Sequence, residues 1–437
     1  MVVPVSAQTL IKLQSAGSRC FFLFLVLLSA TGFGLLAGKV WLAEHWNDLP
    51  DPNLWKKAAE LEPGNASYWL HLGVYHETVL FPSDERRALA EFRKAALANP
   101  HSAEVWLHIA RASENSGDPA AARAAYQKAR LCHPISAVVA WRYGSFLIRQ
   151  ADLPEAYPEI RRSIQADPSL TLSAISQFWE AGQDARQILD GLEPVSARVY
   201  FTALQFFISQ RQADATLAVW HRILDRRLTF EMQQAVPLVN ELIRQDRIDD
   251  AVLTWREALL ATHWPVDAQT AGSLIFDGKF EHDTLNGGFA WRMNPTSGAQ
   301  YAFDGGVTHS GALSLRVTFN GSANPDFAQI QQYVAVEPAR RYRFSAFLRA
   351  AGITTESGVG FEVEDARDPH VLNQFTPALT GSHPWTAAEV EFTTGPSTRL
   401  LLISLRRKPS QRLDNKLSGT VWVDDVTLAP VSSGGKR

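Results

Sequence analysis

The sequence predicts a multi-domain fold that is α and then β: an N-terminal transmembrane helix, an α-solenoid and a C-terminal antiparallel β-sandwich of the jelly-roll type. Three observations support this order. Residues 20–38 carry no charge, residues 51–264 repeat a helical pattern, and the chain after Gly272 alternates between apolar and polar side chains in short segments. A length of 437 residues leaves room for about two or three domains.

Composition and charge exclude some classes of function. The net charge of −3 provides no basic footprint for nucleic acid, so we expect no nucleic-acid partner. Hydrophobic residues make up 46% of the chain and charged residues 20%, which is typical of globular domains. The two cysteines, Cys20 and Cys132, lie in an apolar run and in a helical repeat, so they predict no disulfide framework.

The first element is the apolar run CFFLFLVLLSATGFGLLAG at residues 20–38, which lies between Arg19 and Lys39. At about 1.5 Å per residue, such a run roughly matches a ~30 Å hydrocarbon core. We therefore predict a transmembrane anchor at residues 20–42, preceded by a cytoplasmic segment at residues 1–19. A cleaved signal peptide is the alternative, although its apolar region is usually only ~7–15 residues long. A buried soluble helix is disfavoured because a wholly apolar helix beside a polar N-terminus has little to pack against.

The middle of the chain, residues 51–264, repeats with a period of about 34 residues. The repeat is marked by prolines, and a small residue follows each of the first three at a fixed distance: Pro63, Pro100, Pro134 and Pro168, with Gly73, Ala110 and Gly144. Further along, small–large–small sets occupy one helix face: Ala88, Phe92 and Ala95; Ala122, Tyr126 and Ala129; Ala156, Ile160 and Ser163. These registers predict stacked helix pairs, which are regular over residues 63–168 and more degenerate to residue 264.

This pattern resembles the tetratricopeptide repeat, a helix–turn–helix unit, over about half of the chain. The resemblance implies a curved solenoid whose first helices line an extended peptide groove. The positions that match this groove, and through which we expect a protein partner to bind, are Leu70, Val74, Leu107, Arg111, Trp141 and Arg149. The alternative is that the helical array is a spacer or packs on the last domain, without a peptide partner.

The composition of the sequence changes at about Gly272, where glycine, threonine and aromatic residues become more frequent and the helical periodicity stops. Segments such as YRFSAFLRA at residues 342–350 place alternate side chains on one inward face. Seven or more such strands, separated by turn residues, predict a jelly roll at residues 272–430, followed by a disordered tail at residues 431–437.

The order of motifs in this domain resembles the bacterial carbohydrate-binding modules of the galactose-binding-like type. The motifs are FDGKFE at 276–281, GFAW at 288–291, HSGALSLRV at 309–317, WTAAEVEF at 385–392 and VWVDDVTL at 421–428. The resemblance implies that the first and last strands are neighbours and help to hold a structural calcium ion. The corresponding acids are Glu281 with Asp424 or Asp425, one of the two aspartates being the ligand because neighbouring strand residues point to opposite faces. The alternative is that these aspartates lie at a solvated strand end, where one accepts backbone N–H bonds.

Saccharide binding needs aromatic faces and a few polar groups that fix hydroxyls. The residues available for it are Trp291, Tyr301, Asp326, Phe327, Phe375 and Trp385. Trp291 and Trp385 lie within strand motifs, where such residues belong to the core more often than to a binding platform. The loop that carries Asp326 and Phe327 is the better candidate for a ligand edge.

We expect no enzyme, because the chain has no GxxxxGK[ST], HExxH, GxSxG or CxxC motif. The one catalytic candidate is Glu362 with Glu364, which share a face of a strand at a separation of roughly 7 Å, as in inverting glycosidases. Alternating acids on a strand are ordinarily its solvated face. A basic loop at residues 406–416 is expected to be solvated as well.

Together these features predict a membrane-anchored, non-catalytic protein with a repeat scaffold and a saccharide-binding jelly roll. We expect a polysaccharide or glycan partner, a protein partner in the repeat groove, and structural Ca²⁺. Lysines and arginines are nearly balanced on the two sides of the anchor, so the positive-inside rule does not decide its orientation. The expected calcium and glycan binding of the last domain favours the extracytoplasmic side instead. We expect a single-pass protein of the inner membrane with periplasmic C-terminal domains, serving envelope or exopolysaccharide assembly. The alternatives are a pure interaction scaffold and a glycoside hydrolase.

Overall fold

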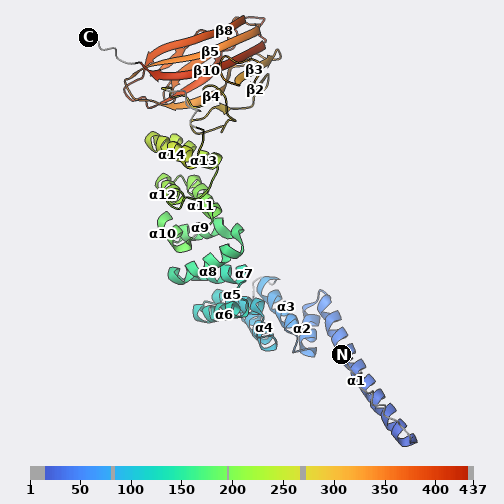
Figure 1. The fold of residues 1–437 in the computed structure, drawn as a ribbon. Coiled ribbons are helices and arrows are strands. Elements are labelled where there is room, and N and C mark those ends of the chain that lie inside the picture. The colour runs from blue at the N-terminus through green and yellow to red at the C-terminus, as the bar shows by residue number, and fades with distance from the viewer. Residues whose placement is uncertain (1–14, 80–83, 194–195, 266–271, 432–437) are drawn as a thin grey trace, which may run out of the picture. The chain divides into compact units, whose positions relative to one another are not determined.

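The computed structural model describes residues 15–79, 84–193, 196–265 and 272–431, and Figure 1 shows its ribbon with most of the helices and some of the strands labelled. The chain forms two compact units. The first contains Met1–Gly182 and Gly191–Glu193, and the second contains Gln183–Asp190 and Pro194–Arg437. Most of the predicted cytoplasmic segment at residues 1–19 and of the predicted disordered tail at residues 431–437 lies outside the described residues.

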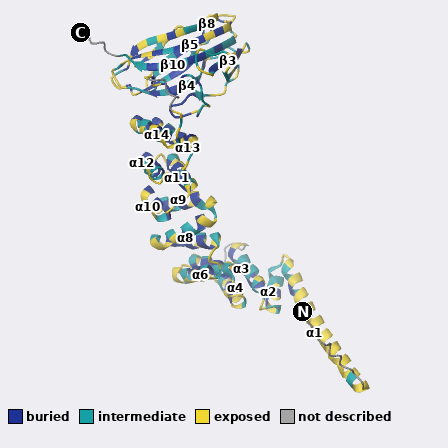
Figure 2. Ribbon diagram, viewed as in Figure 1, coloured by how far each residue is buried: buried dark blue, intermediate teal, exposed yellow. Residues whose placement is uncertain are grey.

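The first helix, α1 (Ala16–Asp48), extends beyond the predicted span of residues 20–42 at both ends. The side chain of Ser15 caps it by accepting the backbone N–H of Ser18 at 3.1 Å. An 18-residue window of α1 has a mean hydropathy of 2.3 with none of it buried, and the helix is largely exposed in Figure 2. By length and composition it can cross a membrane, a test that a signal sequence passes as well.

Helices make up the rest of the first unit and the start of the second. They are α2 (Pro52–Leu61), α3 (Ala66–Val74), the π-turn η1 (Tyr75–Val79), α4 (Glu85–Ala98), α5 (Ala103–Asn115), α6 (Pro119–Cys132), α7 (Ala137–Arg149), α8 (Leu153–Ala166), the 3-10 turn η2 (Pro168–Leu170), α9 (Thr171–Glu180), α10 (Ala185–Leu192), α11 (Ala197–Ser209), α12 (Ala213–Asp225), α13 (Met232–Arg244) and α14 (Ile248–Ala261). Polar side chains accept a first-turn N–H at successive helix starts, which explains where these helices begin: Asp51, Asn65, Asp84, Ser102, Asp118 and Ser136.

The predicted repeat registers are confirmed by burial. In α4, α6 and α8 the small–large–small sets are all buried, and Ala88, Phe92 and Ser163 are 0% exposed. A Cβ atom on Gly73 would overlap the ring of Phe92, and one on Gly144 would overlap Ile160. The small residues are therefore required because the second helix of each pair lies directly against the first.

The recurring tryptophans and prolines also have a structural cause. The indole N–H of Trp69 donates to the carbonyl of Pro63 at 3.1 Å, and that of Trp106 donates to the carbonyl of Pro100 at 2.8 Å. A lysine of the following helix lies over each ring, with Lys94 at 4.2 Å from the centroid of Trp69. These contacts fix the turn between one pair and the next.

Ion pairs join each repeat of the first unit to its neighbour. Arg111 of α5 pairs with Glu77 one repeat earlier, and Arg149 of α7 pairs with Glu114 of α5, with Nε–Oε1 at 2.8 Å. Burial opposes ionisation of Glu77, but hydrogen bonds from His108 and Arg111 hold its pKa below its ordinary value. The arginines thus neutralise acids that the stacking of repeats removes from water.

The second unit ends in a β-sandwich of two five-stranded antiparallel sheets, as predicted (Figure 1). One sheet has the order β1-β4-β9-β6-β7 and the other β2-β3-β10-β5-β8. The strands are β1 (Arg292–Met293), β2 (Ala299–Asp304), β3 (Ser314–Asn320), β4 (Phe327–Ala335), β5 (Arg341–Ile353), β6 (Gly360–Asp365), β7 (Asn373–Phe375), β8 (Gly381–Thr393), β9 (Leu400–Arg407) and β10 (Ser418–Pro430).

Alternating side chains of both sheets fill the core between them. In β5 the predicted inward residues Tyr342, Phe344, Ala346 and Leu348 are at most 1% exposed. Strands β1, β2 and β7 were not predicted. Residues 276–281 were predicted as an opening strand, whereas they form a turn in which Asp277 and Phe280 have positive φ. The first strand, β1, pairs with β4 rather than with the last strand, and it is the segment before it that lies beside β10, where Leu274 N–H donates to Leu428 O at 2.8 Å.

Candidate functional site

The outer face of the β1-β4-β9-β6-β7 sheet carries mainly polar and aromatic side chains, together with the apolar Leu402 and with Ser404, which is only 3% exposed. Ile330, Ile403 and Val363 point into the core, so the alternate positions of β4, β9 and β6 point outward. Strand register places two rows side by side on this outer face. The first row is Arg292, Gln331, Ser404, Glu362 and Phe375; the second is Tyr333, Leu402, Glu364 and Asn373. We call these two rows the binding face.

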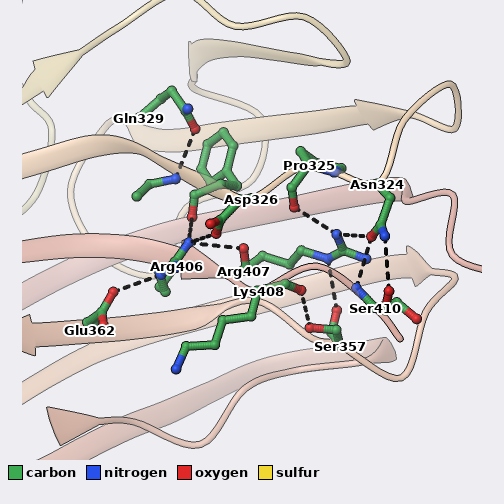
Figure 3. Close-up of polar contacts among 12 residues, drawn as sticks. Asn324, Pro325, Asp326, Gln329, Ser357, Glu362, Arg406, Arg407, Lys408 and Ser410 are labelled. Carbon is green, nitrogen blue, oxygen red and sulfur yellow. Dashed lines mark hydrogen bonds and ion pairs between the residues drawn. The ribbon is translucent and has the colours of Figure 1, made fainter. Parts of the chain in front are cut away.

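One end of the binding face is organised by Arg406 of β9, shown in Figure 3. Its guanidinium forms ion pairs with Asp326 and with Glu362, the latter with Nε–Oε2 at 2.7 Å. The side chains of Arg406 and Glu362 are only 16% and 12% exposed. A charge network therefore lies half-buried across β9 and β6, where hydrogen bonds are stronger than in water.

The acids of β6 have different environments. Glu362 accepts the amide of Asn373 at 3.1 Å in addition to its ion pair with Arg406. Burial raises the pKa of Glu364, and the charge of Glu362 raises it further, against the opposing charge of Arg406. Glu362 and Glu364 share the outward face of β6, as predicted, because Phe361 and Val363 at the alternate positions are buried.

The predicted aromatic residues divide between three environments. Phe375 lies on the binding face with 41% of its surface exposed, and Lys408 Nζ lies 3.9 Å from its ring centroid. Trp291 and Phe327 are 2% and 0% exposed, so their rings belong to the core and the prediction that they stack on a sugar is wrong. Phe327 follows Asp326, which does lie at the surface beside Arg406.

Tyr301 and Trp385 belong to the other sheet. Tyr301 of β2 packs against the core, and its buried hydroxyl has no partner among the described residues, while burial raises its pKa. Trp385 of β8 makes an edge contact with His309, whose ring stacks on Phe347 at 3.7 Å. These two predicted residues therefore cannot act with Phe375 in one site.

A fully buried arginine, Arg407, supports the end of the binding face in Figure 3. Its guanidinium donates to Asn324 Oδ1 at 2.6 Å, to Pro325 O at 2.8 Å and to Thr355 Oγ1 at 3.2 Å. Burial lowers its pKa. The prediction that residues 406–416 form a solvated basic loop is thus wrong at its first two residues, because strand register carries Arg406 onto the sheet and Arg407 beneath it.

The predicted calcium ligands meet at the corner where β10 bulges. Asp424 is fully buried, and its carboxylate accepts the N–H groups of His309 at 2.7 Å and Ser310 at 3.0 Å. Glu281 Oε1 accepts a hydrogen bond from the N–H of Ala312 at 2.7 Å. The carboxylate of Asp425 is hydrogen-bonded to Nδ1 of His309 at 2.5 Å.

These oxygens are of the type that calcium prefers, but in the described chain they are turned toward hydrogen-bond donors. Within residues 15–79, 84–193, 196–265 and 272–431, no group of three or more acids, histidines or cysteines is placed to hold a metal ion. Backbone N–H groups of His309, Ser310 and Ala312 contact these carboxylates in the described chain, and calcium binding at this corner stays a prediction. Burial raises the pKa of Asp424, against the hydrogen bonds that it accepts.

The first unit has a groove where the sequence predicts a peptide-binding surface. A groove of about 470 Å³ is lined by Arg111, Trp141 and Arg149, with Tyr126 at its wall. Both arginines are engaged in the inter-repeat ion pairs described above. Leu70 and Val74 are partly exposed, whereas Leu107 is 5% exposed and belongs to the core, so its assignment to the groove is wrong.

The C-terminal sandwich is similar to known carbohydrate-binding domains. Residues 272–409 match the family model described as a carbohydrate binding domain. A solved family 16 carbohydrate binding module is 18% identical, covering 36% of this chain and 99% of its own, with a TM-score of 0.25. The xylan-binding CBM22-1 domain from Paenibacillus barcinonensis is 17% identical, covering 35% of this chain and 92% of its own, with a TM-score of 0.26.

The helical region is also similar to proteins of solved structure. PilW, a type IV pilus biogenesis factor, is 20% identical, covering 43% of this chain and 91% of its own, with a TM-score of 0.29. No curated protein matches the chain. The protein thus combines an array of helix pairs of the tetratricopeptide-repeat type with a C-terminal sandwich that matches the carbohydrate binding domain family.

Proposed function

We propose that the C-terminal sandwich binds a polysaccharide chain along the binding face without cleaving it. The observation that carries this proposal is the first row, in which Arg292, Gln331, Ser404, Glu362 and Phe375 cross five strands in register. The match of residues 272–409 to a carbohydrate binding domain supports it.

The chemistry of the face suits a sugar polymer. Sugar hydroxyls are recognised by a few fixed polar groups, and Glu362 is fixed by Arg406 and Asn373. The ring of Phe375 supplies an exposed apolar surface on which the carbon-bound hydrogens of a pyranose can pack. Because these groups are held by strands rather than loops, little ordering is required on binding.

The test is retention of the full chain, purified in detergent, on a panel of bacterial and plant polysaccharides. Phe375→Ala and Gln331→Ala are expected to weaken binding to the retained polymer by about tenfold each, as for the loss of a good contact. Phe347→Ala is the matched control, since Phe347 is a partly exposed aromatic residue of the opposite sheet. Equal losses in Phe347→Ala and Phe375→Ala, or retention of no polymer, would refute the proposed site.

Glycoside hydrolysis is a second candidate, favoured by one observation. The environments of Glu362 and Glu364 differ in the way that an acid and a base of a hydrolase differ, because Glu362 is ion-paired and the pKa of Glu364 is raised. A hydrolase would release reducing ends that disappear in Glu364→Gln. A polymer that is retained without new reducing ends supports binding alone.

We further propose that α1 anchors the protein in the inner membrane, with the repeats and the sandwich in the periplasm, and that the protein serves envelope or exopolysaccharide assembly. The length and hydropathy of α1 support the anchor. Protease protection of the sandwich in intact cells, lost when the outer membrane is permeabilised, would support this topology. A mature chain that begins after α1 would instead identify α1 as a cleaved signal sequence.

The groove in the first unit is proposed to bind a protein partner. Trp141→Ala is the variant to test, because Trp141 lines the groove and takes no part in the inter-repeat ion pairs. A charge reversal at Arg111 would instead place an acid beside buried Glu77 and destabilise the array. Loss of a cross-linked partner in Trp141→Ala, with unchanged polysaccharide retention, separates the scaffold role from the sugar-binding role.

A further inference from the structure

The last repeat and the sandwich pack directly against each other within the second unit. Trp255 of α14 makes edge contacts with Phe276 at 5.3 Å and with Phe289 at 6.0 Å between ring centroids. Arg367, in the turn after β6, donates to the carbonyl of Ile243 at 2.6 Å and pairs with Asp246 at 2.9 Å. Helices α13 and α14 are therefore part of the surroundings of the sheet.

A pocket of about 360 Å³ lies at this junction. Helix α13 contributes Asn240 and Arg244, and the sandwich contributes Arg292, Tyr333 and Arg367. Arg292 belongs to the first row of the binding face and Tyr333 to the second. The pocket therefore continues the binding face and closes it with a helix of the last repeat. Its volume is at the lower end of the roughly 300–1,000 Å³ of ligand pockets.

The arginines of this pocket differ in how their charge is compensated. Arg244 pairs with Glu241, and Arg367 pairs with Asp246. Arg292 has no carboxylate partner among the described residues: its Nη2 donates to Asn240 Oδ1 at 2.8 Å, and its guanidinium lies 4.5 Å from the ring centroid of Tyr333. Its Nη1 is buried without a hydrogen-bond partner.

This arrangement is costly in the absence of a ligand. Burial lowers the pKa of Arg292, and an uncompensated buried cation destabilises a fold. Its stacking on Tyr333 and its bond to Asn240 hold the guanidinium plane in place, so the unused N–H groups have a fixed direction. A ligand that brings a carboxylate would satisfy the buried Nη1 and neutralise the charge at once.

We propose that the junction pocket binds the carboxylate of a uronic acid residue, so that the polysaccharide on the binding face is an acidic one. This inference rests on the proposed function, because it places one charged sugar of the same bound chain at the helical end of the face. It assigns α13, a helix of the repeat array, a direct part in recognising the sugar polymer through Asn240 and Arg244.

The experiment compares acidic polysaccharides (polygalacturonate, alginate and hyaluronan) with the same polymers after chemical reduction of their carboxyl groups to alcohols. The full chain in detergent is expected to bind at least one acidic polymer about 10- to 100-fold more tightly than its reduced form, the range for a charge-assisted hydrogen bond. Arg292→Gln should remove this preference, so that the acidic polymer and its reduced form bind the variant with equal affinity. Arg292→Lys should restore only part of it, because an ammonium lacks the planar fork.

The matched control is Arg349→Gln, since Arg349 also lies over an aromatic ring, that of Trp422, but on the opposite sheet. Sulfated dextran serves as a second arm, and tighter binding to it than to any uronate polymer would identify a sulfate site and overturn the carboxylate assignment. Melting temperatures of all variants establish that they fold.

Each outcome separates the two proposals. Equal binding of acidic and reduced polymers would overturn this inference and leave polysaccharide binding standing. A preference that survives Arg292→Gln, or falls equally in Arg349→Gln, would attribute it to overall charge and overturn the pocket. No binding to any polymer, together with no rise in melting temperature with free glucuronate relative to glucose, would overturn both proposals.

Discussion

Replacement of Trp255 by alanine is expected to destabilise the sandwich although Trp255 lies on a helix. Its side chain is 5% exposed and fills the space between Phe276, Phe289 and the backbone at Gly288. The substitution removes this apolar surface and leaves a cavity at the junction. Such changes cost about 3–5 kcal/mol, a factor of roughly 10²–10⁴ in the folding equilibrium.

For a unit of this size the loss corresponds to a melting temperature lower by roughly 6–20 °C. The assay is urea denaturation of the full chain, combined with hydrogen exchange read peptide by peptide. Peptides from α14 and from β10 should lose protection together in Trp255→Ala. Trp106→Ala is the control, because Trp106 is partly exposed in the first unit, where its indole N–H donates to the carbonyl of Pro100 and Lys128 lies over its ring.

The expected cost of Trp106→Ala is under about 2 kcal/mol and is confined to the first unit. If peptides of β10 keep wild-type protection in Trp255→Ala while α14 loses it, the junction does not couple the repeat to the sandwich. That result would also remove the basis for including α13 in a sugar-binding pocket.

Four further predictions follow from buried contacts. Gly144→Val should lower the stability of the first unit by about 1–3 kcal/mol in thermal unfolding, because its side chain would overlap Ile160, whereas Gly64→Ala, with open space around it, should not. The pKa of Glu77 is lowered in the fold, so the ionised carboxylate contributes stability above its ordinary pKa of 4.5, and this stability is lost as pH falls through the folded pKa. In Glu77→Gln the free energy of unfolding should therefore fall less steeply as the pH is lowered. Arg407→Ala should cost about 3–5 kcal/mol in urea unfolding, since it leaves buried carbonyl groups without donors. Calcium, predicted from the resemblance, should raise the melting temperature relative to chelator and lose that effect in Glu281→Gln; equal melting temperatures would mean that amide groups alone hold the β10 corner.

Local pattern predicted the repeats well because their determinants are close in sequence. Phe92 meets Gly73 within one helix pair, and both positions recur with the period of the chain. The inward residues of β5 were predicted for the same reason, since a strand alternates by itself. The aromatic platform was harder, because Trp291 and Phe375 have the same chemistry and only burial distinguishes them.

The binding face depends on which strands are neighbours, and no local pattern contains that information. Gln331 and Ser404 are unremarkable in sequence and become part of a site only through the register of β4 with β9. Arg292 lies in β1, a two-residue strand that was not predicted. Its role in the proposed pocket comes from its having no carboxylate partner among the described residues, which no sequence pattern reveals. A signal was present for Arg407, since an arginine continuing the inward alternation of Leu401, Ile403 and Leu405 must be buried.

The inter-repeat ion pairs give the helical array a direction. Helix α5 presents Arg111 to the repeat before it and Glu114 to the repeat after it, so this repeat carries a basic group on one side and an acidic group on the other. A second copy of the α5–α6 repeat, inserted beside the first, would place its Arg111 opposite the Glu114 of the original copy. The array can therefore change its reach during evolution by copying complete repeats, with the new junction already complementary to the old one.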